Sequence, residues 1–253
     1  MPQLRSDVDQ VGTSLVVRLD GELCGLTVPR VRAILLKCLV DQPDSLVVDL
    51  AGLTVRDPYT LSVFQVVARQ AAMWPGTPIA LSVPQPEIRQ LLADYGRPVV
   101  FAGLDEALAV KPRQGLPSLS ESLLPVRGAP ARARSLADEA CDRWELSRLS
   151  PAARLVTGEL ATNAMVHAQT MFDVRLTLGR RYLLVAVRDG STATPHVDFG
   201  ERGDQATGRG LLLVDAVAER WGSIPADGGK VVWAGLALRE REPVPGEERK
   251  ALN

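Results

Sequence analysis

A segment rich in proline, glycine and serine divides the sequence into two parts of similar length. Residues 112–130, PRQGLPSLSESLLPVRGAP, contain four prolines, three serines and two glycines and show no sustained apolar period. This composition is typical of linkers. Roughly 110 residues lie on each side, enough for each part to bury its own core. We therefore expect a domain at 1–111, a linker at 112–130, a second domain at 131–240 and a polar tail at 241–253.

Charge and cysteine content exclude several classes of protein. The chain has 29 Lys+Arg against 30 Asp+Glu, so it lacks the basic excess of a nucleic-acid binder. No apolar run reaches the roughly 18 residues that span a membrane, and the first ten residues do not resemble a signal peptide. Cys24, Cys38 and Cys141 lie far apart without metal-ligand spacing. We expect buried thiols and a cytoplasmic protein that contacts neither nucleic acid nor membrane directly.

Strand-like and helix-like segments alternate in the first part, which predicts an α/β domain. Asp57 followed by Pro58 is suited to cap and begin a helix, because proline fits the first helical position. The expected strands are residues 15–19, 45–50, 79–83 and 99–101, and the expected helices are residues 28–40, 87–95 and the segment that begins at Pro58.

The second part begins with helices and continues with strands, which predicts an α+β sandwich. The expected helices are residues 131–144, 150–168 and 208–221, and the expected strands are residues 173–178, 182–188 and 230–238.

Polar residues recur at a spacing of four along the predicted helix 150–168. Glu159, Asn163 and His167 would share one face of a regular α-helix. Carboxylate and amide oxygens are suitable ligands for a hydrated Mg²⁺, and a carboxylate can also orient a nucleophile. A solvated helix face explains the pattern as well, and it is the more frequent explanation for this motif alone.

Two further motifs carry polar or small residues at the ends of predicted elements. Asp189 and Gly190 follow an apolar strand, and the aspartate could accept a hydrogen bond from an exocyclic amine such as that of adenine. Asp-Gly is also a common turn dipeptide. Gly208, Arg209 and Gly210 begin a helix, where backbone N–H groups can approach phosphates. Glycines at a helix start also serve conformation alone.

The order of these three motifs resembles the Bergerat fold of the GHKL ATPases. Within that group the anti-sigma factor serine kinases are most similar, through the phrases GELATNAMVHA, VAVRDGS and GRGLLLVDAVAERWG…GGKVVWAGLAL. The resemblance covers residues 131–238. It implies that the domain binds ATP and Mg²⁺.

The resemblance also implies a role for each matching residue. Asn163 would coordinate Mg²⁺, Glu159 would act as general base, and Asp189 with Gly190 would contact adenine. The residues from Gly208 through Arg209 to Gly210 would surround the phosphates, and residues 195–207 would form a lid. His167 is expected to support packing rather than catalysis. The sequence departs from the wider family at two places. The family's Asp-x-Gly-x-Gly segment is DGSTA here, and Ala206 stands where the family has a glycine before the phosphate loop.

The first part resembles an anti-sigma factor antagonist (STAS) domain through VVRLDGEL and SLVVDLAGLTVRD, over roughly residues 10–110. In that family a phosphorylatable serine follows the aspartate, within Asp-Ser-Ser-Gly-Leu. Here Pro58 follows Asp57 and has no hydroxyl, and Tyr59 and Thr60 come next. The hydroxyl of Thr60 is a poor substitute, because each helical residue turns the side chain by about 100°. We expect a degenerate phosphoacceptor region and an unmodifiable domain.

Together the two resemblances imply an ATP-binding regulator of bacterial sigma-factor partner switching. It would be a protein serine/threonine kinase that acts on a separate STAS antagonist. A sigma factor or such an antagonist would be its partner, and its own two domains would contact each other within one chain or in a homodimer. The alternative is a non-catalytic module that sequesters a sigma factor or antagonist. The chain is too short for a gyrase- or MutL-type ATPase, and its only histidines, His167 and His196, are unsuited to a histidine kinase.

Overall fold

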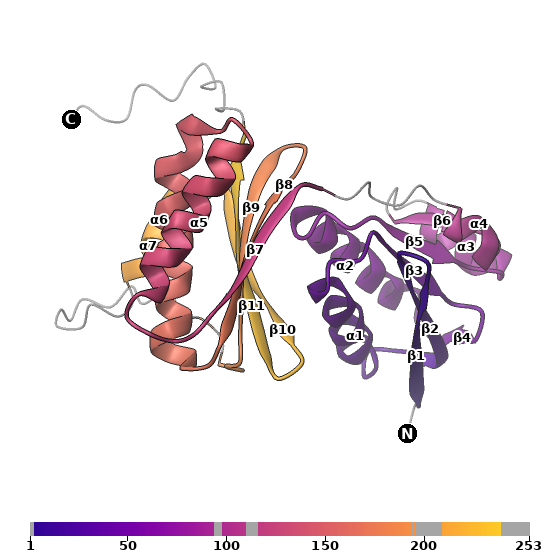
Figure 1. Cartoon of the computed structure of the whole chain (residues 1–253). Helices are drawn as coiled ribbons and strands as arrows, with labels where there is room; N and C mark the ends of the chain where they lie inside the picture. Colours follow the sequence, from indigo (N-terminus) through magenta and orange to yellow (C-terminus); the bar gives the residue numbers. More distant parts are fainter. Residues whose placement is uncertain (1–2, 94–97, 110–115, 194, 196–208, 239–253) are drawn as a thin grey trace, which may run out of the picture.

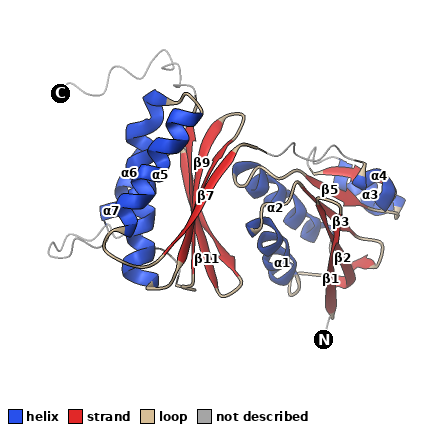
Figure 2. Cartoon of the chain, in the orientation of Figure 1, coloured by secondary structure: helices blue, strands red, loops and turns tan. Residues whose placement is uncertain are grey.

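The computed structural model describes residues 3–93, 98–109, 116–193, 195 and 209–238. The chain forms two sheets, each with its own helices (Figures 1 and 2). We refer to the part up to residue 109 as the N-terminal domain and to the part from residue 116 as the C-terminal domain.

The N-terminal sheet is mainly parallel. Its strands follow the order β1-β2-β3-β5-β6, with β4 paired to the end of β2, and only β1 runs antiparallel to its neighbour. The strands are β1 Leu4–Val11, β2 Ser14–Leu23, β3 Ser45–Asp49, β4 Leu53–Val55, β5 Ile79–Ser82 and β6 Val99–Phe101.

Helices cover both faces of this sheet. Helices α1 and α2 pack on one face in a large apolar core, and α4 packs on the other face through Ala107. The predicted helix 28–40 and strand 99–101 are confirmed, whereas β1, β4 and α4 are additional. Strand β1 escapes prediction because only Leu4 of its eight residues is buried. The helices are α1 Val28–Val40, α2 Ser62–Met73 after a 3₁₀ turn at Pro58–Leu61, α3 Pro86–Ala93 and α4 Leu104–Leu108.

The C-terminal sheet is antiparallel throughout and carries its own helices on one face. Its strands follow the order β10-β11-β9-β8-β7, which confirms the predicted sandwich of helices on a sheet. The strands are β7 Ser118–Leu123, β8 Phe172–Leu178, β9 Tyr182–Asp189, β10 Arg220–Ala226 and β11 Gly229–Ala237. The helices are α5 Ala129–Arg143, α6 Ser150–Asn163 and α7 Arg209–Val217, with a 3₁₀ turn at Ser147–Leu149 and a π-helical turn at Ala164–Ala168.

Two predicted boundaries are wrong. The linker expected at 112–130 contains β7, which pairs with β8, and α5 already begins at Ala129. Prolines flank β7, and its alternation of apolar and polar residues is short. Its leucines are more buried than its serines. The helix expected at 208–221 ends at Val217, and β10 begins at Arg220. Glycine and proline within β10 conceal it, since both residues are uncommon inside strands.

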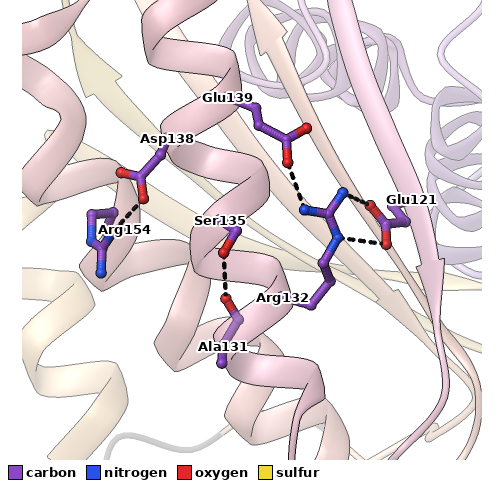
Figure 3. Close-up of polar contacts among 7 residues, drawn as sticks. All are labelled: Glu121, Ala131, Arg132, Ser135, Asp138, Glu139 and Arg154. Atoms are coloured by element: carbon purple, nitrogen blue, oxygen red, sulfur yellow. Dashed lines mark hydrogen bonds and ion pairs between the residues drawn. The ribbon is translucent and has the colours of Figure 1, made fainter.

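Polar contacts fix β7 and α6 to α5 (Figure 3). Arg132 of α5 donates to both carboxylate oxygens of Glu121 on β7, at 2.9 and 2.6 Å, and to Glu139 at 2.5 Å. Hydrogen bonds to Glu121, then Glu139, raise the pKa of Arg132. Asp138 of α5 accepts from Ser150 at 2.8 Å and also pairs with Arg154 of α6. A bidentate arginine–carboxylate pair has a fixed geometry, so β7 is an integral part of the C-terminal domain.

Strands β9 and β11 of the C-terminal sheet are buried on both faces. Successive residues of β9 alternate between them: Val185 lies in the core under α5 and α6, whereas Leu184 and Ala186 belong to the core of α1 and α2. Figure 1 shows the resulting layers, with α1 and α2 between the two sheets. This double burial explains why β9 and β11 read as continuous apolar runs rather than alternating ones.

Two tryptophans lie at the centre of the contact between the domains. Trp74, directly after α2, stacks on Trp233 of β11 with ring centroids 6.3 Å apart and planes 11° from parallel. Both are at most 3% exposed. A Cβ on Gly222 would lie 3.1–3.3 Å from the Trp233 ring, so glycine on the neighbouring strand leaves room for the indole.

Charged pairs surround this apolar contact. Nζ of Lys37 lies 2.6 Å from Oδ1 of Asp227, and Nη1 of Arg188 lies 3.5 Å from Oδ1 of Asp41. The expected contact between the two domains of one chain is therefore present. It is made by α1 and by the end of α2, and it covers the sheet face opposite α5, α6 and α7.

Two of the sequence expectations concern the burial of the cysteine thiols and the presence of membrane-spanning helices. Burial raises the pKa of the Cys38 thiol to about 11, and that of Cys141 to about 11. Cys24 is half-buried, and all three thiols are free. Among the helices that the structure describes, none has the length and apolar character to cross a membrane.

The interface predicts unequal effects for two substitutions. Trp233→Ala should destabilise the chain by about 3–5 kcal/mol, as expected for removing a buried tryptophan. Lys37→Ala removes an exposed pair and should change the free energy of unfolding by at most about 1 kcal/mol. Urea unfolding followed by circular dichroism measures both. Equal losses in the two variants would contradict the central role of the tryptophan contact.

Candidate functional site

Helix α6 presents two of the predicted site residues one turn apart. Glu159 and Asn163 are both half-buried. Among the described residues, neither side chain has a hydrogen-bond partner. The turn before them is packed, since Val156, Thr157 and Gly158 are buried. The two polar groups therefore lie at the border of the core, where they are accessible to a ligand.

Gly210, in the first turn of α7, lies directly against these two side chains. A Cβ built on Gly210 would lie 2.5 Å from Oε2 of Glu159 and 3.7 Å from Oδ1 of Asn163. A side chain at this position would displace the carboxylate, so glycine is required for the close approach. The structure thus brings together three predicted residues from segments about 50 positions apart.

The remaining residues of the glycine motif are described only in part. Arg209 is the first residue of α7. Gly208, Ala206, His196 and residues 196–207 of the expected lid lie outside the described residues.

Asp189 is the last residue of β9 and is almost fully buried. Its position in the alternation of β9 places it on the same face as Val185 and Val187, beneath the helices. Its Oδ1 accepts from the backbone N–H of Ser191 at 2.8 Å and from Nζ of Lys230 at 3.0 Å. Asp189 is therefore held in a defined orientation.

Lys230 is a site residue that the sequence analysis did not single out. It pairs with Asp189 in the register of β11 and β9, and its side chain is 9% exposed. Its Nζ also donates to the carbonyl of Ser191 at 3.2 Å. A lysine at the start of the apolar run KVVWAGLAL was the available signal, because buried lysines need a partner.

Gly190 lies in close contact with the turn that precedes β8. Its N–H donates to the hydroxyl of Thr170 at 2.9 Å, and an added Cβ would lie 2.9 Å from the same oxygen. The segment after Asp189 is thus fixed by Thr170 and by Lys230.

His167 does not join this group. Residues 164–168 form a π-helical turn, and the side chain of His167 is exposed. The wider turn means that the i, i+4 alignment of a regular α-helix does not extend from Asn163 to His167.

The segment around Pro58 has a different character. The carboxylate of Asp57 accepts from the N–H of Tyr59 at 3.0 Å, which caps the turn as predicted. The hydroxyl of Thr60 is buried and donates to the carbonyl of Asp57 at 2.5 Å. Pro58 is exposed and Tyr59 is 83% exposed, so the other domain does not cover them.

A shallow groove begins beside Pro58 on the N-terminal domain. Its volume is about 470 Å³, and its lining includes Leu53, Val55, Ile88 and Leu91. Leu91 is 42% exposed. The surface at the start of α2 is therefore open, whereas the end of α2 lies against the C-terminal sheet.

Comparison with protein families identifies the N-terminal domain. Residues 5–107 match the model of the STAS domain, so this part of the chain is a STAS domain. The match agrees with the resemblance of residues 10–110 noted in the sequence. No match was found among the curated proteins.

Three solved structures are similar to this part of the chain. An anti-sigma factor antagonist from Mycobacterium paratuberculosis is 19% identical, with a TM-score of 0.36, and the match covers 42% of this chain and 92% of that one. Unphosphorylated SpoIIAA, an anti-sigma factor antagonist, is 21% identical over 41% and 93%, with a TM-score of 0.35. A single-residue variant of RsbS from Moorella thermoacetica is 23% identical over 41% and 92%, with a TM-score of 0.35.

The geometry around Pro58 predicts that Pro58 and Thr60 stay unmodified. Proline has no hydroxyl, and the Thr60 hydroxyl is buried and already hydrogen-bonded. The intact chain incubated with Mg·ATP, digested and analysed by mass spectrometry should show no phosphate on these residues. Phosphate there, absent from a Thr60→Val variant, would contradict the prediction.

Proposed function

We propose that the chain is an ATP-binding regulator of bacterial sigma-factor partner switching. Its C-terminal domain would be a GHKL-type protein serine/threonine kinase of the anti-sigma factor kind. Its substrate would be a serine on a separate STAS protein, because its own STAS domain has Pro58 at the acceptor position.

The observation that carries this proposal is the contact of Gly210 with Glu159 and Asn163. A nucleotide site of this type needs a helix start, a carboxylate and a metal-binding amide at one place. The first turn of α7 offers the backbone N–H groups of a helix start, which favour phosphate. The space where a Gly210 Cβ would lie is beside the carboxylate of Glu159. These residues therefore fit Mg·ATP.

Each residue would have a separate task in phosphoryl transfer. Asn163 would hold Mg²⁺, which neutralises charge on the phosphates. Asp189 and Gly190 would bind adenine, and Gly208, Arg209 and Gly210 would bind the phosphates. Glu159 would accept the proton of the substrate serine hydroxyl. The serine oxygen would then form the bond to the γ-phosphorus, and ADP would leave. Positioning and charge stabilisation dominate such reactions, so little further chemistry is needed.

The position of the STAS domain supports an open nucleotide site. It lies on the sheet face opposite α6 and α7, so it does not block the residues assigned to ATP. Its groove beside Pro58 also remains open, so a sigma factor or an antagonist has access to both surfaces. Pairing between two copies of the chain is compatible with this arrangement.

A non-catalytic module that sequesters a sigma factor or antagonist is the second candidate. It is favoured by the missing acceptor hydroxyl at Pro58 and by the DGSTA sequence after β9, where the related kinases have more glycine. Such a module would hold ATP, or no nucleotide, without transferring phosphate.

Transfer of labelled phosphate distinguishes the two candidates. The intact chain is incubated with radiolabelled ATP and a STAS protein that carries the acceptor serine. Glu159→Gln should lower transfer at least about 100-fold, within the range that general-base catalysis contributes. Asp142→Asn, a change at an exposed carboxylate of α5, should retain transfer. No transfer by the wild type, with ATP still bound, would favour the non-catalytic module.

A second variant tests the steric requirement at the same site. Gly210→Ala should push the Glu159 carboxylate aside and reduce transfer, while the free energy of unfolding stays within about 1 kcal/mol because that side chain can move. Gly103→Ala, where the added Cβ meets nothing within 4 Å, is the matched control. Full activity of Gly210→Ala would contradict the assigned contact.

A further inference from the structure

The pair formed by Asp189 and Lys230 lies at the end of the C-terminal sheet beneath the helices. Their side chains are 4% and 9% exposed, and Nζ lies 3.0 Å from Oδ1. Removing two charges from water is unfavourable unless each is compensated. A ligand that binds beside this pair must therefore leave both charges compensated.

The two oxygens of Asp189 have different environments. Oδ1 accepts two hydrogen bonds, from Lys230 and from the N–H of Ser191. Among the described residues, Oδ2 has no hydrogen-bond partner. An ionised carboxylate accepts hydrogen bonds only, so Oδ2 is an acceptor whose direction is fixed by the two donors on Oδ1.

Lys230 also fixes the segment that follows Asp189. Its Nζ donates to the carbonyl of Ser191 as well as to Asp189, so one ammonium group joins both ends of the turn. The N–H of Gly190 is held by Thr170 at the same time. The lysine thus sets the shape of the turn and the orientation of the aspartate together.

We propose that Lys230 determines the base selectivity of the nucleotide site. By holding Oδ1 it fixes the orientation of Asp189 and leaves Oδ2 to accept a hydrogen bond from the exocyclic amine of adenine. This inference rests on the proposed binding of ATP and adds a specificity-determining residue to it. Lys230 acts through Asp189 and is a positioning residue.

The role predicts which nucleotides the site rejects. A base without the exocyclic amine leaves Oδ2 unpaired, and a site with an unpaired buried acceptor binds such an analogue weakly. Without Lys230 the carboxylate loses one of the two donors that fix Oδ1, is free to turn, and no longer distinguishes the two bases.

The test compares ATP with purine riboside triphosphate, which lacks the amine, on the intact chain with Mg²⁺. The ratio of the two dissociation constants is measured by calorimetric titration. The wild type should favour ATP by about tenfold or more, the effect of one hydrogen bond to a charged group. Lys230→Met should reduce the preference below about threefold. Lys37→Met, at an exposed lysine paired with Asp227, should keep the wild-type ratio.

The outcomes separate this inference from the proposed function. A wild-type preference that survives in Lys230→Met overturns the role of Lys230 and leaves ATP binding intact. Binding of neither nucleotide to the wild type overturns both. If Lys230→Met does not unfold cooperatively, Lys230→Gln removes the charge with a polar side chain, and its ratio is interpreted in the same way. A purely structural role would lower both affinities and leave their ratio unchanged.

Discussion

The stacking of Trp74 on Trp233 is the interaction on which the arrangement of the two domains depends. It joins the end of α2 to the middle of the C-terminal sheet and makes one continuous apolar core from α1, α2 and the outer face of that sheet. Since α5 and α6 bury the other face, β9 and β11 are covered on both sides, and the open part of the sheet is a pocket of about 370 Å³ beside β7 and β8 whose lining includes Asp173, Arg175 and Arg188. The candidate nucleotide residues lie elsewhere, at the strand ends and at the border between α6 and α7.

The candidate site lies at the ends of the sheet strands and at the border of the helical layer. Asp189 and Lys230 are at the ends of two paired strands, and Gly210 meets Glu159 at the border of the helical layer. The STAS domain lies behind the sheet, away from these residues. The surface around Pro58 points elsewhere, because the opposite end of α2 carries the tryptophan contact. One chain can thus present the proposed nucleotide site and the STAS surface around Pro58 at the same time.

Local patterns predicted most elements of the fold. Residues 28–40 show helical apolar spacing, and Asp57 caps the turn at Pro58 as its type and position suggest. Strands β1, β7 and β10 were missed because their side chains are mostly exposed or interrupted by proline and glycine. Such strands are defined by their neighbours' hydrogen bonds rather than by their own residues.

The candidate site was predictable to a similar extent. Glu159 and Asn163 follow from spacing along one helix, and the structure adds Gly210 to them. The link between Asp189 and Lys230 depends on the register of β9 and β11, which no local pattern contains. The Trp74–Trp233 contact was likewise beyond local reasoning, although the uninterrupted apolar runs of β9 and β11 already indicate burial on both faces.

Hydrogen–deuterium exchange of the intact chain, with and without Mg·ATP, tests most directly whether the nucleotide site and the STAS contact occupy opposite faces. The account predicts slower exchange in α6, in residues 189–191 and at the start of α7. Exchange in α1 and β10, at the domain contact, should stay unchanged. Protection confined to the domain contact, or no change in α6 and α7, would contradict the account.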